Sequence, residues 1–199
     1  ALIAQADVLI VSPGINIAES EINKAITSNC DVIGDIELFC RLSDTPILAV
    51  TGSNGKSTVV SMLNYVGNDI GYRVQLGGNI GLPVLDQIDK EQADFIVLEL
   101  SSFQLESVKS MKALAATVLN LSDDHLDRHK TLANYGAIKQ SIYHNCTYAI
   151  FNRNDHATKP NGLYAQSQLL SFGSDQAQSA DFGLANIHDE SHLMYGEQA

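Results

Sequence analysis

The segment Ala49–Thr58, which reads AVTGSNGKST, constrains the fold of this chain more than any other stretch. It joins an apolar run to a stretch of helical character, and its Gly-Lys-Ser sequence is typical of loops that hold phosphate groups. Gly52 and Gly55 permit tight turns that expose backbone N–H groups, and the start of the following helix adds partial positive charge. The usual pattern has an outer glycine where this chain has Val50, so we predict a variant phosphate loop rather than a plain strand–helix turn.

The rest of the chain fits an α/β protein with a mainly parallel sheet, because short apolar runs alternate with helical stretches. Strands are expected at 7–11, 31–33, 47–51, 73–76, 94–100, 117–121 and 148–152, and helices at 19–28, 35–42, 56–70 and 132–144. After Asn154 the short alternating runs predict antiparallel hairpins at a sheet edge. A domain boundary is expected near Gly34.

Composition narrows the classes of partner. The chain has 12 basic and 23 acidic residues, a net charge of −11, which disfavours nucleic acid and anionic membranes. No apolar run approaches the roughly 20 residues of a membrane-spanning helix. The three cysteines have no metal-like spacing and cannot all pair, which indicates a reduced cytosolic compartment. The start lacks a methionine and a basic signal-peptide region and leads into a strand, so we expect a fragment.

Polar side chains follow several of the expected strands, where ligands of parallel sheets collect. Glu99 ends an apolar strand, and it is interpreted either as a Mg²⁺ ligand or as an acid that protrudes beyond the sheet. Asn79 follows two glycines in an expected turn, where it either contacts a substrate or forms an Asx turn.

A further polar cluster, Asn120–His129, follows another expected strand. Asp123, Asp124 and His125 suit a divalent cation or a phosphate. Viewed alone, a histidine such as His125 is more often a helix-capping or surface residue than a ligand, and the alternative for the two aspartates is an N-cap of the next helix. His129 is assigned to the surface. From these patterns alone the chain is a Mg²⁺–nucleotide enzyme of unknown reaction.

Five motifs together resemble the Mur ligases: TGSNGKST, GGNIG, LELSSFQLE, NLSDDHLDRH and YGAIKQSIY, in that order and spacing. The resemblance runs from about Val8 to Asn152, and the family's shorter loop has no outer glycine at the position of Val50. It implies that residues 1–34 are the end of a Rossmann-like domain that binds a UDP-linked substrate. Residues 35–199 would then be most of a central P-loop-type ATPase domain, and the C-terminal domain would be absent.

Within the family, GDIELFCR and the Ser-Asn pair of the loop resemble the branch that adds D-glutamate to UDP-N-acetylmuramoyl-L-alanine. The resemblance implies ATP-driven amide formation through an acyl phosphate, in cytoplasmic peptidoglycan synthesis and hence in cell shape and division. It also implies that this fragment alone is inactive, and a monomer is favoured. Two alternatives stay open: a ligase of the Mur or folylpolyglutamate type that uses another amino acid, and a nucleotide-dependent ATPase or switch without ligase activity.

The resemblance also implies roles for individual residues. Catalytic roles fall on Lys56, Glu99, His125 and Lys139. The nucleotide would be bound by Gly52, Ser53, Asn54, Gly55, Lys56, Ser57 and Thr58, and the substrate by Gly14, Asn79, Ser101 and Tyr135. Mg²⁺ ligands would be Ser57, Glu99, His125 and Lys139, the last as a carbamate formed with CO₂. Without the resemblance, Lys139 is interpreted as a solvated surface lysine.

Overall fold

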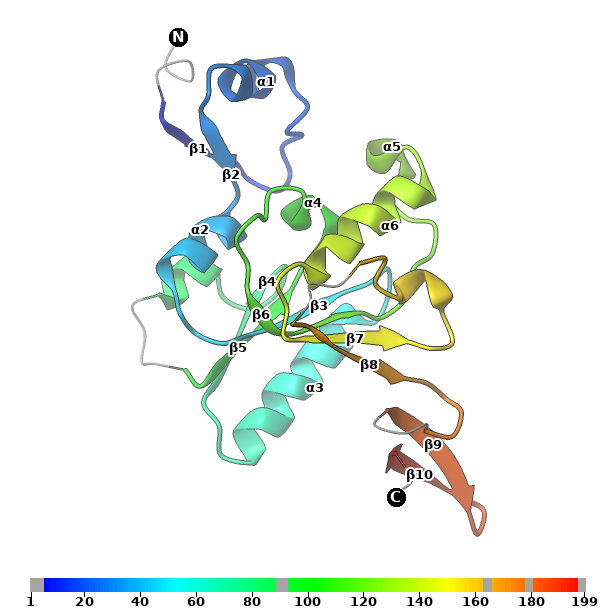
Figure 1. Cartoon of the computed structure of the whole chain (residues 1–199). Helices are drawn as coiled ribbons and strands as arrows, with labels where there is room; N and C mark the ends of the chain where they lie inside the picture. The colour runs from blue at the N-terminus through cyan, green and yellow to red at the C-terminus, as the bar shows by residue number, and fades with distance from the viewer. Residues whose placement is uncertain (1–5, 89–92, 163–165, 178–180, 197–199) are drawn as a thin grey trace.

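The computed structural model describes residues 6–88, 93–162, 166–177 and 181–196. Its N-terminal part is a small parallel sheet of two strands, β1 (Val8–Ile10) and β2 (Asp31–Ile33), connected by helix α1 (Ser20–Thr27). The helix packs Ile22 and Ala25 onto a core of its own that includes Val11 and Val32. This unit stands at one end of the molecule, above α2 (Asp35–Leu42) in Figure 1.

The larger part is an eight-stranded sheet in the order β10-β9-β8-β7-β6-β3-β5-β4. Its strands are β3 (Ile47–Thr51), β4 (Val74–Gly78), β5 (Phe95–Glu99), β6 (Ala113–Val118), β7 (Tyr148–Asn152), β8 (Gln168–Phe172), β9 (Phe182–Ile187) and β10 (Glu190–Tyr195). Strands β3 to β8 run parallel, and β9 pairs with β10 in an antiparallel hairpin. The fold is therefore α/β with a mainly parallel sheet, as the sequence predicts.

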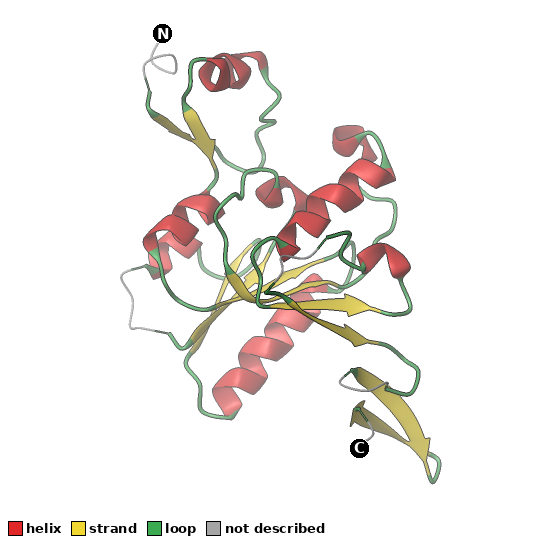
Figure 2. Ribbon diagram, in the orientation of Figure 1, coloured by secondary structure: helices red, strands yellow, loops and turns green. Residues whose placement is uncertain are grey.

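Helices cover both faces of this sheet (Figures 1 and 2). Helix α3 (Lys56–Asp69) lies on one face, and α4 (Ser102–Leu105), α5 (Leu126–His129) and α6 (Leu132–Gln140) lie on the other side. Side chains of a strand alternate between faces. In β3, Val50 accordingly packs against Val60 of α3, whereas Ala49 belongs to the larger core on the opposite face. Short 3₁₀ helices lie at Val84–Gln87, Ser141–Tyr143 and His156–Thr158.

Several expected boundaries were wrong for physical reasons. Gly77 and Gly78 are not a turn but the end of β4, paired with Leu98 and Glu99. Gly78 has φ 96°, and an added Cβ would lie 2.1 Å from the carbonyl oxygen of Glu99, so only glycine fits there. Strand β6 ends at Val118 rather than at residue 121, because the backbone beyond it bonds to the phosphate loop instead.

The C-terminal tail follows the prediction only in part. The run around Leu170 forms β8, which pairs parallel to β7 and is not part of a hairpin. The last two strands, β9 and β10, form the antiparallel hairpin that the alternating pattern predicts. Expected helix 132–144 ends as α6 at Gln140 and continues as a 3₁₀ turn.

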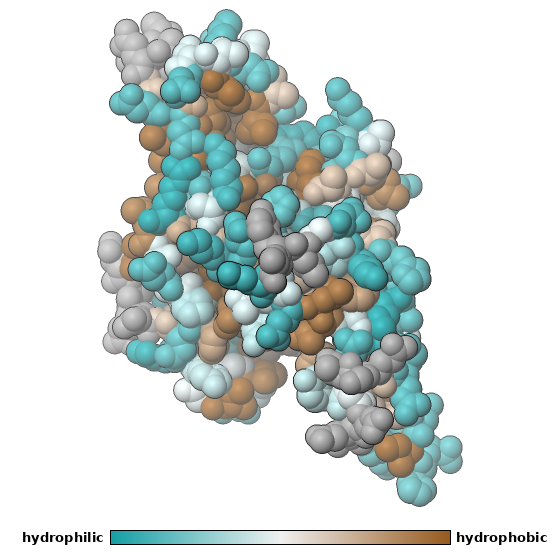
Figure 3. Space-filling model, viewed as in Figure 1, coloured by the Kyte–Doolittle hydropathy of each residue, from teal (hydrophilic) through white to brown (hydrophobic). Residues whose placement is uncertain are grey.

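The surface carries hydrophobic residues in separate patches among hydrophilic ones on the face drawn in Figure 3. Within the described residues, none of the helices has the length and apolar character needed to cross a membrane. The cysteines Cys30, Cys40 and Cys146 are all free thiols.

Candidate functional site

The strand order gathers the polar segments at one edge of the sheet. Strands β6, β3, β5 and β4 are neighbours and parallel, so their carboxyl ends meet at that edge. The phosphate loop follows β3, Glu99 ends β5, Asn79 follows β4, and the segment with Asp124 follows β6. The expected common edge for these segments is therefore present, at the position where open α/β sheets bind ligands.

The phosphate loop has the backbone that its glycines predict. Gly55 adopts a left-handed conformation with φ 79° and immediately precedes α3, while Gly52 has φ 152°. Lys56 curls back over the loop, and its Nζ donates to the carbonyl oxygens of Gly52 at 2.8 Å and Ser53 at 3.0 Å. Ser57 and Thr58 are exposed in the first turn of α3. A hydroxyl-bearing helix N-terminus next to a lysine is suited to a phosphate chain with its cation.

Asn120 holds the phosphate loop from the neighbouring strand, a role that the sequence reasoning missed. Its Oδ1 accepts from the backbone N–H of Asn54 at 2.9 Å, and its Nδ2 donates to the carbonyl of Asn54 at 3.0 Å. The backbone N–H of Ser53 donates to the carbonyl of Asn120 at 3.0 Å. The position after a buried strand was the one available signal, and it could not reveal the partner 66 residues away.

Glu99 is buried at this edge and does not protrude from the sheet. The residue is 1% exposed, and its Oε1 accepts from the side-chain amide of Asn79 at 2.8 Å. Its Oε2 is buried and has no hydrogen-bond partner among the described residues. A buried carboxylate oxygen without a donor is costly, and a cation would satisfy it. The donor chemistry at Glu99 therefore fits a Mg²⁺ ion.

Lys139 is buried beside the loop, so its interpretation as a surface lysine was wrong. It is 1% exposed, and its Nζ donates to Thr51 Oγ1 at 3.1 Å and to the Gly52 carbonyl at 3.0 Å. Burial lowers the pKa of this amine to about 7, with a further lowering from Lys56, while Asp124 and Glu99 act in the opposite direction. Only the resemblance indicated this residue, because nothing in the sequence around it predicts burial.

Tyr135 contacts both Lys139 and the phosphate loop. It is 1% exposed, its hydroxyl lies 3.3 Å from Ser53 Oγ, and Lys139 Nζ lies 4.8 Å from its ring centre. Ser101 caps α4, accepting from the N–H of Gln104 at 3.2 Å and completing a capping box. Gly14 lies in an exposed turn of the N-terminal unit, so its substrate role stays a prediction.

Two histidines of the cluster after β6 have different surroundings. His125 is half-exposed, and its Nε2 lies 3.5 Å from a carboxylate oxygen of Asp124. His129, assigned to the surface from the sequence, is in fact buried at 1% exposure, with Nε2 2.9 Å from Ser102 Oγ. Its partners come from another helix, which the local pattern could not show.

Among the residues that the structure describes, acidic, histidine and cysteine side chains alone do not form a complete metal centre. The described residues contain no group of three or more such side chains placed to hold a metal ion. The predicted set supplies two of this kind, Glu99 and His125, and its other members are the hydroxyl of Ser57 and a modified Lys139. The unpartnered oxygen of Glu99 and the lowered pKa of Lys139 fit that set, whose coordination stays a prediction.

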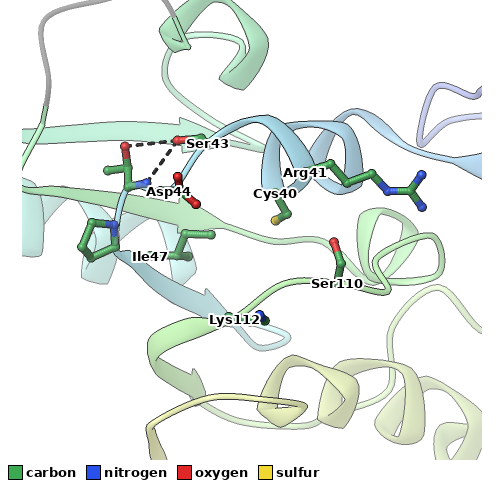
Figure 4. Close-up of a pocket in the computed structure, with 9 residues that line it drawn as sticks. Cys40, Arg41, Ser43, Asp44, Ile47, Ser110 and Lys112 are labelled. Carbon is green, nitrogen blue, oxygen red and sulfur yellow. Dashed lines mark hydrogen bonds between the residues drawn. The ribbon is translucent and has the colours of Figure 1, made fainter.

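A cavity of about 420 Å³ lies away from this site, beside the end of α2 and the start of β3 (Figure 4). Its lining includes Lys112, Ser110, Cys40 and Asp44. The guanidinium of Arg41 is bound to acidic side chains instead, to Asp31 at 2.6 Å and to Glu37 at 2.8 Å. The other two charged side chains of this lining, Lys112 and Asp44, have opposite charges, so the cavity does not favour a particular class of ligand.

The fold and the loop define a class: an α/β protein with a phosphate loop of the P-loop type. The family model for the Mur ligase middle domain matches residues 50–196. This chain therefore belongs to the Mur ligase family. The family resemblance in the sequence motifs and the expected fold class are both confirmed.

Similar proteins agree with this assignment. The UDP-N-acetylmuramoylalanine–D-glutamate ligase of Colwellia psychrerythraea is 50% identical over 212 residues, covering 100% of this chain and 45% of the relative. The ligase of the same name from Vibrio vulnificus is 40% identical over 200 residues, covering 100% of this chain and 44% of the relative. This chain thus spans less than half the length of these curated relatives.

Solved structures share the fold at low sequence identity. The MurF ligase of Thermotoga maritima in complex with ADP superimposes with a TM-score of 0.60 at 16% identity, covering 97% of this chain and 58% of that one. The UDP-N-acetylmuramate:L-alanyl-gamma-D-glutamyl-meso-diaminopimelate ligase of Neisseria meningitides gives 0.62 at 19% identity, covering 96% and 65%.

Proposed function

We propose that the intact protein is an ATP-dependent amide ligase that joins D-glutamate to UDP-N-acetylmuramoyl-L-alanine in peptidoglycan synthesis. The observation that carries the proposal is the 50% identity to a ligase of that name along the whole of this chain. The site supports it, because a phosphate loop, a buried carboxylate and a buried lysine meet at one sheet edge. Such a ligase would act in the cytoplasm, where ATP and the nucleotide-linked precursor are supplied.

The reaction would proceed in two displacements. The carboxylate of the L-alanyl group attacks the γ-phosphate of ATP, which gives an acyl phosphate and ADP. The amine of D-glutamate then attacks the acyl carbon, loses a proton and expels phosphate. Transfer between anions depends mainly on positioning and on charge neutralisation. Lys56 and the loop N–H groups from Gly52 to Thr58 would provide both at the phosphates.

Mg²⁺ would be held by this chain's own side chains at the same edge. Ser57 and Glu99 would hold one ion, and Glu99, His125 and a carbamylated Lys139 would hold a second. Bound Mg²⁺ supplies the positive charge that offsets the phosphate oxygens during transfer. The carbamate forms when the neutral amine of Lys139 attacks CO₂ and releases a proton. Its lowered pKa, about 7, provides a substantial neutral fraction near neutral pH.

The remaining assignments follow the family. Residues 1–34 would be the end of the domain that binds the UDP-linked substrate, and residues 35–199 most of the central ATP-binding domain. Gly14, Asn79, Ser101 and Tyr135 would contact that substrate. Asn79 also orients Glu99 through its 2.8 Å amide contact, so it would link the substrate to the ion. A monomer is the favoured state.

The test is phosphate release by the intact protein with ATP, Mg²⁺ and defined substrates. We expect release only when UDP-N-acetylmuramoyl-L-alanine and D-glutamate are both present, with a ligated product detected by mass spectrometry. A panel of other amino acids identifies a related ligase if one of them replaces D-glutamate. Rapid phosphate release with ATP alone would overturn the ligase proposal in favour of an ATPase.

Replacing Lys56 with alanine tests the phosphate loop within this reaction. The amine is the loop's one side-chain cation, so Lys56→Ala should lower kcat by a factor on the order of 100 or more, comparable to losing a donor to a developing oxyanion. Lys24→Ala, on exposed α1, is the matched control and should leave turnover unchanged. Turnover of the Lys56 variant equal to that of the native protein would remove the loop from the mechanism.

A further inference from the structure

A cluster of buried and partly buried side chains packs against Tyr135 of the candidate site, and the proposed chemistry gives it no role. The His129 cluster comprises Ser102, Phe103 and Glu106 of the α4 region with Arg128 and His129 of α5. His129 lies at its centre, 1% exposed. One ring nitrogen, Nε2, lies 2.9 Å from Ser102 Oγ, and the other, Nδ1, lies 3.5 Å from a carboxylate oxygen of Glu106.

The imidazole is also packed between two aromatic rings. Phe103 is stacked on it at a centroid distance of 5.4 Å and an angle of 24°, and Tyr135 lies 5.4 Å away at 45°. Arg128 closes the cluster: its guanidinium lies 5.0 Å from the ring centre of Phe103 and 2.6 Å from Glu106. These contacts and its 1% exposure restrict the imidazole to one position.

The neighbours of His129 belong to the elements that carry the site. Ser102 begins α4, two residues after Leu100 and three after Glu99 in the chain. Tyr135 belongs to α6, contacts Ser53 of the phosphate loop, and lies beneath the amine of Lys139. His129 therefore contacts both the segment after Glu99 and the helix that carries Lys139.

We propose that His129 is a positioning residue, which holds the α4 start and helix α6 at the spacing that places Glu99 and Lys139 together in the site. This proposal deepens the proposed ligase function and rests on it for its consequence on turnover. With the ring hydrogen on Nδ1, the side that faces the Glu106 carboxylate, Nε2 would accept from the Ser102 hydroxyl. The hydrogen bond fixes α4, and the ring face fixes Tyr135.

Two substitutions separate the hydrogen bond from the packing. His129→Phe keeps a ring next to Phe103 and Tyr135 but removes both nitrogens, so Ser102 loses this contact and Glu106 keeps its contact with Arg128. His129→Gln retains a polar group near the position of Nε2 and should preserve the contact to Ser102. His188→Asn, at an exposed turn of the β9–β10 hairpin with φ 53°, is the control, since asparagine tolerates that backbone.

The first measurement is steady-state kinetics of the intact protein. His129→Phe should lower kcat by about 10- to 100-fold, the effect expected when reacting groups are misplaced by about 1 Å, with KM for ATP within about twofold. His129→Gln should recover most of that loss. An unchanged kcat in His129→Phe, or equal losses in both variants, would overturn the proposal.

The second measurement does not depend on activity. Hydrogen exchange followed by mass spectrometry should show faster exchange in His129→Phe at residues 101–106 and 132–140, with α3 unchanged. Faster exchange throughout the protein would show a general loss of stability and overturn the positioning role. If the native protein has no ligase activity, the proposed function fails, yet this exchange pattern still decides whether His129 couples the two helices.

Discussion

At the scale of single residues, the site is built from groups whose ordinary chemistry has been changed by burial. Lys139 would be a hydrated cation on the surface, but its environment favours the neutral amine. Glu99 lies at the same edge, and one of its carboxylate oxygens has no hydrogen-bond partner in the described part of the chain. The carbamate that the neutral amine would form with CO₂ and the carboxylate of Glu99 are both anions, so one cation between them would neutralise both.

Replacing Lys139 with alanine tests the modified lysine directly. The Lys139→Ala protein should lose at least about 100-fold in kcat, since it lacks one anionic oxygen donor. Acetate at high concentration should restore part of the activity, because a small carboxylate fits the space of the lost carbamate. Chloride at the same ionic strength is the control. Equal rates in acetate and chloride would argue against a carbamate at this position.

Cys40 gives a second residue-scale prediction. It lines the cavity of Figure 4, yet burial, with an additional contribution from Glu37, raises the pKa of its thiol to about 12. Because the thiolate is the nucleophile, alkylation by iodoacetamide at pH 8 should be slower than for free cysteine by roughly a thousandfold. Mass spectrometry of the peptide with Cys40, before and after unfolding in urea, measures this. Rapid labelling of the native protein would contradict it.

At the scale of elements, the site depends on loops from neighbouring strands that hold one another. The segment after β6 binds the phosphate loop through backbone and side-chain contacts of Asn120. Two hydrogen bonds of this kind contribute about 1–3 kcal/mol together. These bonds hold the loop amides in place before a nucleotide binds, so the entropy cost of ordering the loop does not reduce the binding free energy.

Removing this side chain should therefore weaken nucleotide binding. We expect Asn120→Ala to raise the Kd for Mg²⁺–ADP by about 10-fold, measured by isothermal titration calorimetry. Asn186→Ala is the matched control, because it removes an exposed side chain of β9 that accepts from the Ser191 hydroxyl within the hairpin and lies outside the site. A Kd equal to that of the native protein would mean that the loop keeps its conformation without Asn120.

The elements that sequence reasoning predicted well have strong local signals. The strand, glycine loop and helix from Ile47 to Asp69 follow from an apolar run, two glycines and a helical pattern. Helix α4 was missed although Ser101 and Gln104 form a capping box, because a helix of four residues is too short to show a repeating hydrophobic pattern. The burial of His129 and Lys139 was missed for another reason: their partners, Ser102 and Thr51, are distant in the chain.

At the scale of the whole molecule, charged side chains connect the small N-terminal sheet to the large one. Asp31 of β2 accepts from Arg41 of α2 at 2.6 Å and from Lys109 at 2.8 Å. Glu37 of α2, fully buried, accepts from the backbone N–H groups of Lys109 and Ser110 at 2.7 and 2.8 Å and from Arg41 at 2.8 Å. The network thus anchors the joining helix to the segment that leads into β6.

Burial should decide which of these two acids matters for stability. Glu37→Gln leaves three donors poorly satisfied in a dry site, so we expect it to lower the free energy of unfolding by about 2–4 kcal/mol. Asp31→Asn breaks ion pairs in which the side chains are 35–54% exposed, and solvent screening should limit its effect to less than about 1 kcal/mol. Urea unfolding at pH 7 measures both, and equal effects would contradict the role of burial.

The pH dependence of the Glu37 contribution follows from its surroundings. Burial alone raises the pKa of this carboxyl, but the N–H donors of Lys109 and Ser110 and the Arg41 side chain outweigh it and lower the pKa. The folded protein therefore binds fewer protons than the unfolded chain near the ordinary glutamate pKa of about 4.3. The stabilisation should be complete above that pH and lost as pH falls through the lowered value.

Urea unfolding measures this dependence in the native protein and in Glu37→Gln. The difference in their free energies of unfolding should be constant between about pH 6 and 8 and should narrow below about pH 4. A difference that widens on acidification would mean that Glu37 is not held as a carboxylate in the folded protein.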